Sequence, residues 1–548
     1  MTRREGLLRA SGITFAGIVV GAAATLLLAQ VVGSQLAARG TGLFFQAVAV
    51  FAILSNALQL GADTALVRTL SRRTALGDTA TLGRTVRTAV IPVAVVSAIV
   101  TVAVFLAADV LGALLAPADP AHLAQVLRLL APFLGAGALL AVLLGGTRGI
   151  GSTLPYTLLQ NIGLPVLRLG VVVAAIAAGL SIPLIVTGWA APLALLALVA
   201  AVVLLRRLRA AHADASAAPS APASASPVAS DAGFWSFALP RGASTLIERM
   251  LDWTGVLVVV TVAGPAAGGV YAIVTRCAGA GTMVDQAARI VTGPRISRAL
   301  ATGDRAAASR LFLDVTRGIV AVAWPFYLTL AVFAPAVLSL FGPEFVAGAL
   351  PLALISLAMM LATTAGMVQS VLLMGGRSTW QLGNRLVQLV VLLVVTAALV
   401  PVLGLTGAAI GWIAAVAVDT TLATVQVAVR LGIRSSPRLI ALPAALAALV
   451  FGAGGLVAAA TFGQSVPVLL GTTAVLGLLY LAVGFALRRR LGFVRPVRPG
   501  PAPTALDVPP APGAPAAPAA SARPTASVPS PPRTGAPGAP ALLNEVAR

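Results

Sequence analysis

The sequence predicts an all-α integral membrane protein with about fourteen transmembrane helices, in two pseudo-symmetric six-helix lobes followed by two C-terminal helices. The composition is the first indication, because 59% of the 548 residues are hydrophobic and only 10% are charged, with a mean hydropathy of +0.99. Apolar segments long enough to cross a bilayer recur along the whole chain. Arginines gather in every second connection between these segments, as the topology of a multi-pass protein requires.

A spanning helix needs about 20 mainly apolar residues, and this rule gives the candidate spans in order. They are Gly12–Val32, Gly42–Val67, Val86–Ala108, Leu123–Leu144, Pro155–Ala178, Pro183–Leu205, Pro240–Gly264, Gly269–Val291, Leu311–Phe333, Phe345–Met374, Gln381–Pro401, Thr406–Val429, Pro437–Ala460 and Pro467–Leu487.

The arginines orient these spans. Connections after even-numbered spans are rich in Arg, whereas those after odd-numbered spans offer only Arg39, with Arg128 just inside the fourth span. Positive residues stay on the cytoplasmic side of a membrane, so both termini are expected to be cytoplasmic. The Arg-only, Ala-rich composition is typical of a GC-rich bacterial genome, which places the expected multi-pass protein in the bacterial plasma membrane.

Composition also divides the chain into domains. Residues 206–233 are rich in Ala, Ser and Pro and are expected to form a flexible cytoplasmic linker between an N-lobe, 1–205, and a C-lobe, 234–430. Residues 431–490 hold the two additional helices. Residues 491–548 are richer still in Pro and Ala and are expected to be a disordered cytoplasmic tail.

A weak internal repeat crosses the linker. The second span begins with Gly42-Leu43-Phe44 and is followed by Arg68, Leu70, Ser71 and Arg72. The eighth begins with Gly269-Val270-Tyr271 and leads to Arg295, Ile296, Ser297 and Arg298. Repeats of the same orientation are related by an axis along the membrane normal, which predicts a central cavity between the two lobes.

The stretch Pro240–Gly264 is long enough to span a membrane, yet it carries Glu248, Arg249 and Asp252. Charges inside a membrane usually face a bundle interior or a wet cavity, so this stretch is a candidate transport pathway. Two other interpretations stay open: an internal ion pair that fixes the helix, and an acid that binds H⁺ or Na⁺ as a coupling ion. Asp285, Arg289 and Asp419 are expected to be interfacial or lobe-packing charges.

Several kinds of activity are excluded or disfavoured. The chain has no Lys, so it cannot hydrolyse ATP through a GxxxxGK[ST] loop. A single cysteine, Cys277, and two histidines, His122 and His212, rule out an intramolecular disulfide and a Cys/His metal cluster. No cofactor and no nucleic acid are expected. A membrane glycosyltransferase or polymerase is the enzymatic alternative, but the longest outer connection, Asp109 to His122, supplies few catalytic groups, so an enzyme is not expected.

Short motifs resemble a known family. Gly42-Leu43-Phe44, followed by the run from Leu60 to Arg68, is similar to the second-helix pattern of polysaccharide exporters. These are the Wzx-type oligosaccharide flippases of the MOP superfamily, which also contains MATE transporters. Arg249, Asp252, Gly269-Val270-Tyr271 and Arg276 match a second pattern of that family. The resemblance covers most of residues 5–490. It implies a MATE-like fold, alternating access, and translocation of polyprenyl diphosphate-linked glycans to the outer leaflet for cell-surface polysaccharide biosynthesis.

A diphosphate needs cationic partners inside the membrane. The candidate substrate-binding residues are Arg249, Arg276, Arg168 and Arg385, and the coupling-ion or ion-pair candidates are Glu248, Asp252 and Asp63. The expected partners are the lipid-linked glycan, membrane lipids, H⁺ or Na⁺, and polysaccharide polymerases and glycosyltransferases. Two related functions remain alternatives: a cation-coupled MATE-type multidrug exporter, and a lipid II flippase. Lipid II flippases carry cationic residues inside their first helix. This sequence departs from that pattern, because its first span has no cationic residue after Arg9.

Overall fold

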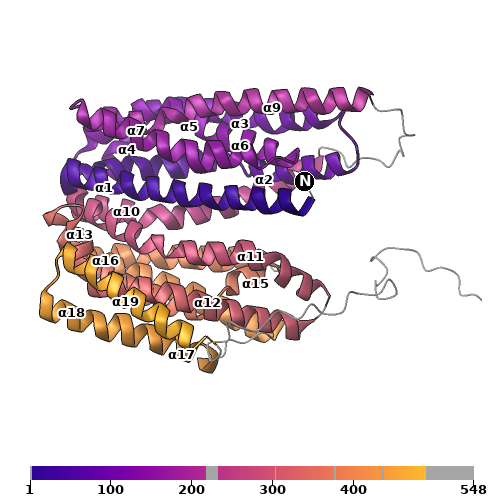
Figure 1. The fold of residues 1–548 in the computed structure, drawn as a ribbon. Helices are drawn as coiled ribbons and strands as arrows, with labels where there is room; N and C mark the ends of the chain where they lie inside the picture. Colours follow the sequence, from indigo (N-terminus) through magenta and orange to yellow (C-terminus); the bar gives the residue numbers. More distant parts are fainter. Residues whose placement is uncertain (1–2, 218–231, 303, 375–377, 433–436, 489–548) are drawn as a thin grey trace, which may run out of the picture. The chain divides into compact units, whose positions relative to one another are not determined.

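The computed structural model describes residues 3–217, 232–302, 304–374, 378–432 and 437–488, and every regular element in these ranges is a helix (Figure 1). The elements are α1 (Arg3–Ala57), α2 (Ala62–Ala75), α3 (Leu82–Leu106), α4 (Ala108–Leu115), α5 (Pro120–Gly149), α6 (Leu154–Tyr156), η1 (Thr157–Gly163), α7 (Leu164–Ala177), α8 (Ile182–Ala190), α9 (Pro192–Ala217), α10 (Ala232–Ala280), α11 (Thr282–Ala301), α12 (Arg305–Val332), α13 (Ala334–Ser339), η2 (Pro343–Gly348), α14 (Ala349–Thr364), α15 (Val368–Met374), α16 (Ser378–Leu431), α17 (Pro437–Ala447), η3 (Ala448–Ala453), α18 (Gly454–Phe462) and α19 (Val466–Ala486).

Three helices are too long for one membrane crossing, and each reverses direction at one residue. Helix α1 has 55 residues, which would extend over roughly 80 Å if straight, against a hydrocarbon core of about 30 Å. Non-helical backbone interrupts α1 at Ala37 (φ 55°), α10 at Gly264 (φ 89°) and α16 at Gly404 (φ 54°). The hydroxyl of Thr41 donates to the carbonyl oxygen of Val32 at 3.1 Å, which is impossible along a straight helix. We call the end of the bundle at these reversals the kink end, and the opposite end, where α9 stops and α10 begins, the linker end.

The described residues contain 11 helices that are long and apolar enough to cross a membrane, as expected of a multi-pass integral membrane protein. The expected second span, Gly42–Val67, is not continuous. Helix α1 ends at Ala57, and α2 begins after Leu60 (φ 52°) and Gly61 (φ 70°). The cause is a close contact, because a Cβ on Gly61 would lie 2.1 Å from the carbonyl oxygen of Ala238 in α10. The expected span Phe345–Met374 is likewise divided, by Gly366 (φ 66°) between α14 and α15.

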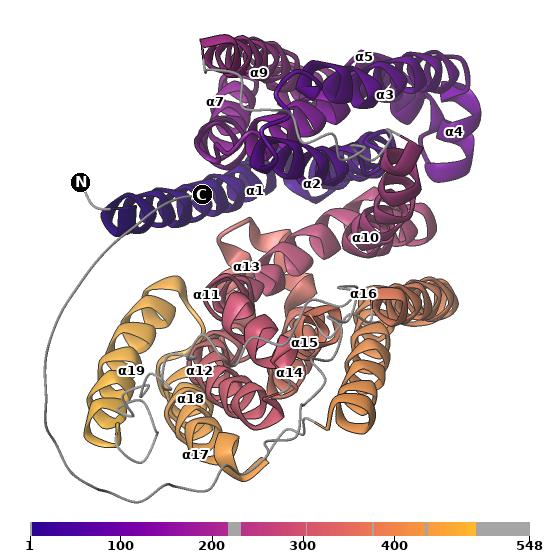
Figure 2. The same cartoon turned by 90° about the vertical axis from the view of Figure 1, so that its right-hand side faces the viewer.

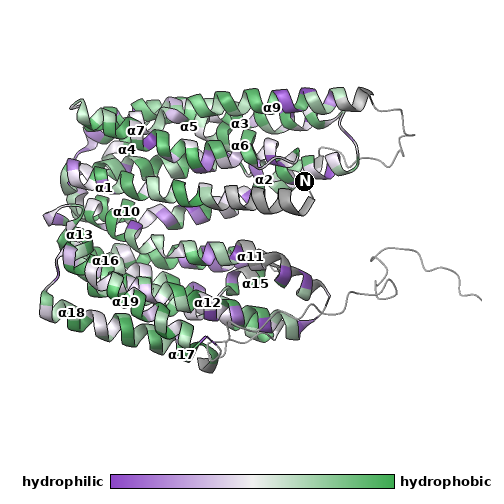
Figure 3. Ribbon diagram, in the orientation of Figure 1, coloured by the Kyte–Doolittle hydropathy of each residue, from purple (hydrophilic) through white to green (hydrophobic). Residues whose placement is uncertain are grey.

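The helices form two groups, α1 to α9 and α10 to α19, which Figures 1 and 2 show on opposite sides of the molecule. From here on we call them the N-lobe and the C-lobe, and this C-lobe also includes α17 to α19, which the sequence analysis set apart within residues 431–490. Helix α9 continues to Ala217, beyond the expected start of the linker at residue 206, while 218–231 and the tail 491–548 lie outside the described residues. Hydrophobic residues cover most of the helices, and hydrophilic ones gather in the linker-end parts of α11 and α12 (Figure 3).

The internal repeat is visible in the backbone. Ala37 and Gly264 share an unusual conformation, with ψ values of 174° and 169°. Five residues after each reversal stands a glycine that packs on the other helix. A Cβ on Gly42 would lie 1.8 Å from the carbonyl oxygen of Pro265, and one on Gly269 would lie 2.1 Å from that of Ala38. Such reciprocal contacts are those of an isologous, two-fold interface. The repeat therefore places a pseudo-two-fold contact between α1 and α10.

Further hydrogen bonds join the lobes at the kink end. The backbone N–H of Ala38 donates to Glu344 Oε1 at 2.7 Å, and Gln30 Nε2 donates to the carbonyl oxygen of Leu340 at 3.3 Å. Thr261 Oγ1 in α10 donates to the carbonyl oxygen of Leu115 in the N-lobe at 2.8 Å. The kink end is thus closed by cross-lobe contacts in this structure.

We expect Gly42→Ala to lower the thermal stability of the detergent-purified protein. The new methyl group would overpack the contact with Pro265, a change that typically costs about 1–3 kcal/mol. The matched control is Gly170→Ala in α7, where an added Cβ meets nothing within 4 Å. Melting curves of the two variants should separate clearly. Equal melting temperatures would show that the glycine contact does not hold the lobes together.

Candidate functional site

Two cavities meet at the middle of the molecule. The first, the C-lobe cavity, has a volume of about 580 Å³ and is lined by residues of α10, α11, α12, α14, α15 and α16. The second, the inter-lobe cavity, has a volume of about 480 Å³ and is lined from both lobes, including Asn56, Asp63 and Arg148 of the N-lobe. Arg249, Asp252, Arg289 and Arg385 are among the residues that line both. A polar space therefore leads from the lobe interface into the C-lobe.

The charged stretch of α10 lies at this junction. Arg249 Nη1 donates to Asp252 Oδ2 at 3.2 Å, as their i,i+3 spacing allows. Both side chains are about half exposed, at 48% and 59%, so the pair borders open space rather than packed helix. Glu248 lines the inter-lobe cavity. The ion pair and the cavity position, which the sequence left as alternatives, occur together.

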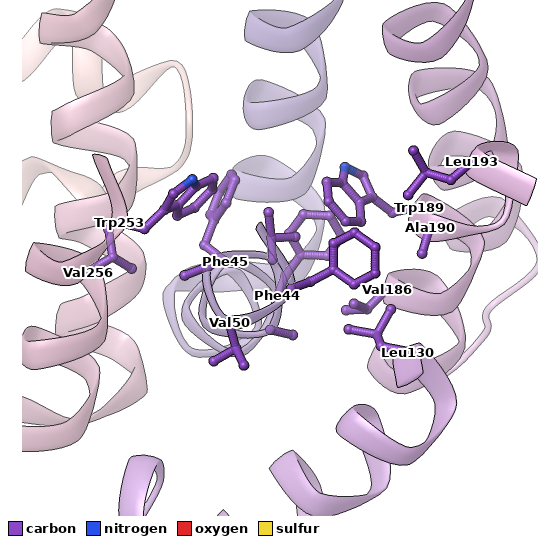
Figure 4. Packing of buried hydrophobic residues seen from close by; sticks show 14 of the residues in the cluster. Phe44, Phe45, Val50, Leu130, Val186, Trp189, Ala190, Leu193, Trp253 and Val256 are labelled. Carbon is purple, nitrogen blue, oxygen red and sulfur yellow. The ribbon is translucent and has the colours of Figure 1, made fainter. Parts of the chain in front are cut away.

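Arg276 is held differently, by aromatic faces. Its guanidinium carbon lies 4.1 Å from the centre of the Trp253 ring and 5.3 Å from that of Phe45. In Figure 4, Phe45 points from α1 towards Trp253 of α10, while Phe44 points the opposite way, towards Trp189. Among the described residues, no carboxylate lies within ion-pair distance of Arg276. The C-lobe cavity thus contains a guanidinium that forms no ion pair with the described residues, and we call Arg276 unmatched in this sense.

A buried polar network forms part of the lining of the C-lobe cavity. Arg385 Nη1 lies 3.4 Å from Asp419 Oδ2, across the two arms of α16. Gln369 Nε2 of α15 donates to Asp419 Oδ1 at 2.8 Å, and Arg385 Nη1 donates to Gln388 Oε1 at 2.8 Å. The Asp419 side chain is only 8% exposed, so Arg385 and Gln369 together replace the water that the carboxylate has lost.

The remaining charged lining residues are also paired. Asp285 accepts hydrogen bonds from Arg289 one turn further along α11, and Asp63 Oδ2 of α2 lies 4.0 Å from Arg148 Nη2 of α5. Asp285, Arg289 and Asp419 were expected to be interfacial or lobe-packing charges, and all three line the C-lobe cavity. The reversal of α16 at Gly404 brings Asp419 near Arg385, a proximity that no local sequence pattern indicated.

Arg168 stands apart from the other candidate residues. Its guanidinium carbon lies 3.7 Å from the centre of the Trp189 ring, and Nε donates to the carbonyl oxygen of the same residue at 3.2 Å. It is not among the residues that line either cavity. These contacts join α7 to α8, so Arg168 has a packing position within the N-lobe. The cavities bring together the six other candidate residues.

No group of three or more His, Cys, Asp or Glu side chains that could hold a metal ion occurs within the described ranges. The arrangement offers paired charges, one unmatched cation, amides and aromatic faces. These groups suit the binding of a polar, anionic molecule in a membrane-embedded cavity.

We expect Asp419→Asn to destabilise the protein by about 3–5 kcal/mol, because it leaves the Arg385 charge without its counter-ion. The double variant Arg385→Gln, Asp419→Asn should be more stable than this single variant, since neither charge is then present. Thermal unfolding of the two single variants and the double variant forms a mutant cycle. Strictly additive losses would contradict a coupled pair.

Comparison with known proteins identifies the fold. No family model and no curated protein sequence matches the chain. Solved structures do match. The lipid II flippase MurJ, in an inward closed conformation, has a TM-score of 0.66 at 10% identity, and the match covers 88% of this chain and 100% of MurJ.

Transporters of the multidrug type match as well. An inward-facing multidrug resistance MATE family transporter of the MOP superfamily has a TM-score of 0.55 at 18% identity, covering 74% of this chain and 94% of that one. The eukaryotic MATE transporter AtDTX14 has a TM-score of 0.53 at 15% identity, covering 81% and 100%. These three proteins are transporters or flippases, not enzymes. The chain has the MOP-superfamily fold, which flippases and multidrug transporters share.

Proposed function

We propose that this protein is a flippase that moves a polyprenyl diphosphate-linked oligosaccharide across the plasma membrane by alternating access. The observation that carries the proposal is Arg276, an unmatched guanidinium held between Phe45 and Trp253 at the C-lobe cavity. A buried cation is costly unless something compensates it. A diphosphate would do so through charge-assisted, bidentate hydrogen bonds.

The neighbouring groups extend this anion site. Arg249 and Arg385 line both cavities, and their remaining N–H groups can donate to a bound diphosphate while each arginine keeps its carboxylate partner. The inter-lobe cavity gives the sugars a polar path between the lobes, while the polyprenyl chain remains in lipid. Arg168 is left out of this proposed site because its contacts lie within the N-lobe.

The topology completes the proposal. If each reversed helix counts as two passes, the 11 candidate spans become fourteen, with α17 to α19 supplying the last two. The arginine distribution then puts the kink end outside and both termini in the cytoplasm of a bacterial cell. In this arrangement the structure is closed to the outside. Transport then requires that the close contacts of Gly42 and Gly269 separate and that the hydrogen bond from Ala38 to Glu344 breaks.

The coupling ion would be H⁺ or Na⁺. Of the carboxylates that line the two cavities, Glu248 is the one for which no ion-pair partner occurs among the described residues. It is therefore the proposed place where a coupling cation binds. Polysaccharide polymerases and glycosyltransferases are the proposed functional partners, since they would produce and consume the lipid-linked glycan.

A second candidate function is multidrug export, favoured by the MATE transporters among the similar structures. Aromatic residues and carboxylates at the same cavity could accept an organic cation. The two functions differ in the sign of the charge on the ligand.

We expect Arg276→Gln to weaken binding of geranyl diphosphate, a short soluble probe, by about tenfold or more, because a hydrogen bond to a charged group is worth about 1.5–3 kcal/mol. Arg168→Gln is the matched control, since this arginine also stacks on a tryptophan but lies away from the cavities. Calorimetric titration of the purified full-length protein measures both. An equal loss in the two variants would contradict the assignment. Binding of tetraphenylphosphonium but not of geranyl diphosphate would favour drug export.

Orientation can be checked with cysteines in a Cys277→Ala background. Ala118 lies in the exposed turn between α4 and α5 at the kink end, and Ala80 lies in the exposed turn between α2 and α3 at the linker end. A membrane-impermeant maleimide should label Ala118→Cys on intact cells and Ala80→Cys only after permeabilisation. The reverse pattern would invert the proposed topology and the direction in which the structure is closed.

A further inference from the structure

We infer that the sugars entering these cavities carry no negative charge, so that the substrate is a neutral glycan on a diphosphate lipid. The inference rests on the proposed function and specifies its substrate class. It follows from the balance of charges along the cavity walls and from the uncharged polar atoms left without partners there.

The cavity walls are electrically balanced although the whole chain has a net charge of +21. Five arginines line the two cavities, and so do five carboxylates. The arginines are Arg148, Arg249, Arg276, Arg289 and Arg385, and the carboxylates are Asp63, Glu248, Asp252, Asp285 and Asp419. Four ion pairs join them, between Arg148 and Asp63, Arg249 and Asp252, Arg289 and Asp285, and Arg385 and Asp419. Arg276 and Glu248 remain outside these pairs, and Arg276 is the proposed site for the diphosphate.

A carboxylate on the glycan would therefore find no free counter-ion. It would lose hydration on entering the cavity, and every arginine besides Arg276 already faces a protein carboxylate. Glu248, which has no ion-pair partner among the described residues, would repel it at the inter-lobe cavity. Acidic sugars are thus selected against by repulsion and by desolvation.

Neutral hydroxyl groups, in contrast, find partners. Gln369 Oε1 and the Tyr327 hydroxyl are buried without a hydrogen-bond partner among the described residues, and both residues line the C-lobe cavity. These residues are only 7% and 1% exposed, so bulk water does not satisfy them. Asn56 Oδ1 is likewise unpartnered at the inter-lobe cavity. A sugar hydroxyl both donates and accepts, and so can satisfy each of these atoms once its side chain turns towards the cavity that the residue lines.

Aromatic residues add a surface on which a sugar ring can lie. The indole of Trp412, which is partly exposed, lines the C-lobe cavity together with the uncharged amide of Gln388. Trp253 is already covered by Arg276. The C-lobe cavity therefore combines an apolar face with uncharged hydrogen-bonding atoms, and the anion site lies at its border.

The test compares three probes on the purified full-length protein: geranyl diphosphate linked to glucose, to glucuronic acid, and to glucuronic acid methyl ester. Intrinsic tryptophan fluorescence is a suitable readout because Trp253 and Trp412 line the cavity. The glucuronate probe should bind about tenfold more weakly than the glucose probe, a difference that corresponds to about 1.4 kcal/mol. The methyl ester should recover most of this loss. Equal or tighter binding of the glucuronate probe would overturn the inference.

A charge-relief variant gives an independent arm. Asp252→Asn frees Arg249 from its half-exposed pair, and should reduce the discrimination against glucuronate by several-fold. The matched control is Asp109→Asn, which frees Arg128 at an exposed pair away from both cavities and should leave the discrimination unchanged. An equal effect of both variants would overturn the inference. Geranyl diphosphate without a sugar distinguishes failure of the proposed function from failure of this inference. If neither it nor any sugar conjugate binds, the proposed function fails and this inference fails with it. If it binds but the glucose and glucuronate probes bind equally, only this inference fails.

Discussion

The close backbone contact between α1 and α10 is the constraint on which the rest of the structure depends. Glycine at positions 42 and 269 lets two helices approach until carbonyl oxygens lie where side chains would otherwise stand. The contact closes the kink end and fixes the pseudo-two-fold relation of the lobes. It also carries Phe45, three residues after Gly42, across to Trp253 and Arg276. The geometry of the proposed anion site is thus a consequence of the helix contact.

The second constraint is the cost of charge inside a membrane. Each paired arginine of the cavity wall brings its own carboxylate, so the site is polar without a large net charge. This arrangement makes one unmatched guanidinium effective, because no described carboxylate forms an ion pair with it and its N–H groups remain available to a ligand anion. A uniformly cationic cavity would bind polyanions with little selectivity. A cavity with equal numbers of arginines and carboxylates accepts a negative charge only where the substrate meets the unpaired arginine.

Much of the fold follows from the sequence because membrane crossing is a local property. Length and hydropathy locate the spans, and the lipid forces each to be helical, as α3, α5, α12 and α19 illustrate. The repeated glycine motif marked two positions, Gly42 and Gly269, that make reciprocal close contacts in the structure. The charged residues of α10 could be recognised as cavity candidates because charged side chains within a membrane span usually face the bundle interior or a water-filled cavity.

Other features depend on residues distant in sequence and appear only in the tertiary structure. Nothing local to Gly61 shows that α10 will press against it and end the preceding helix, and nothing local to Arg168 shows that the Trp189 ring will cover it. The pairing of Arg385 with Asp419 depends on how the two arms of α16 align. The sequence by itself determined which residues cross the membrane and which carry charge there. Only the tertiary structure decided which charges cancel and that Arg276 remains unmatched, because charge pairing depends on distances between helices that no local pattern encodes.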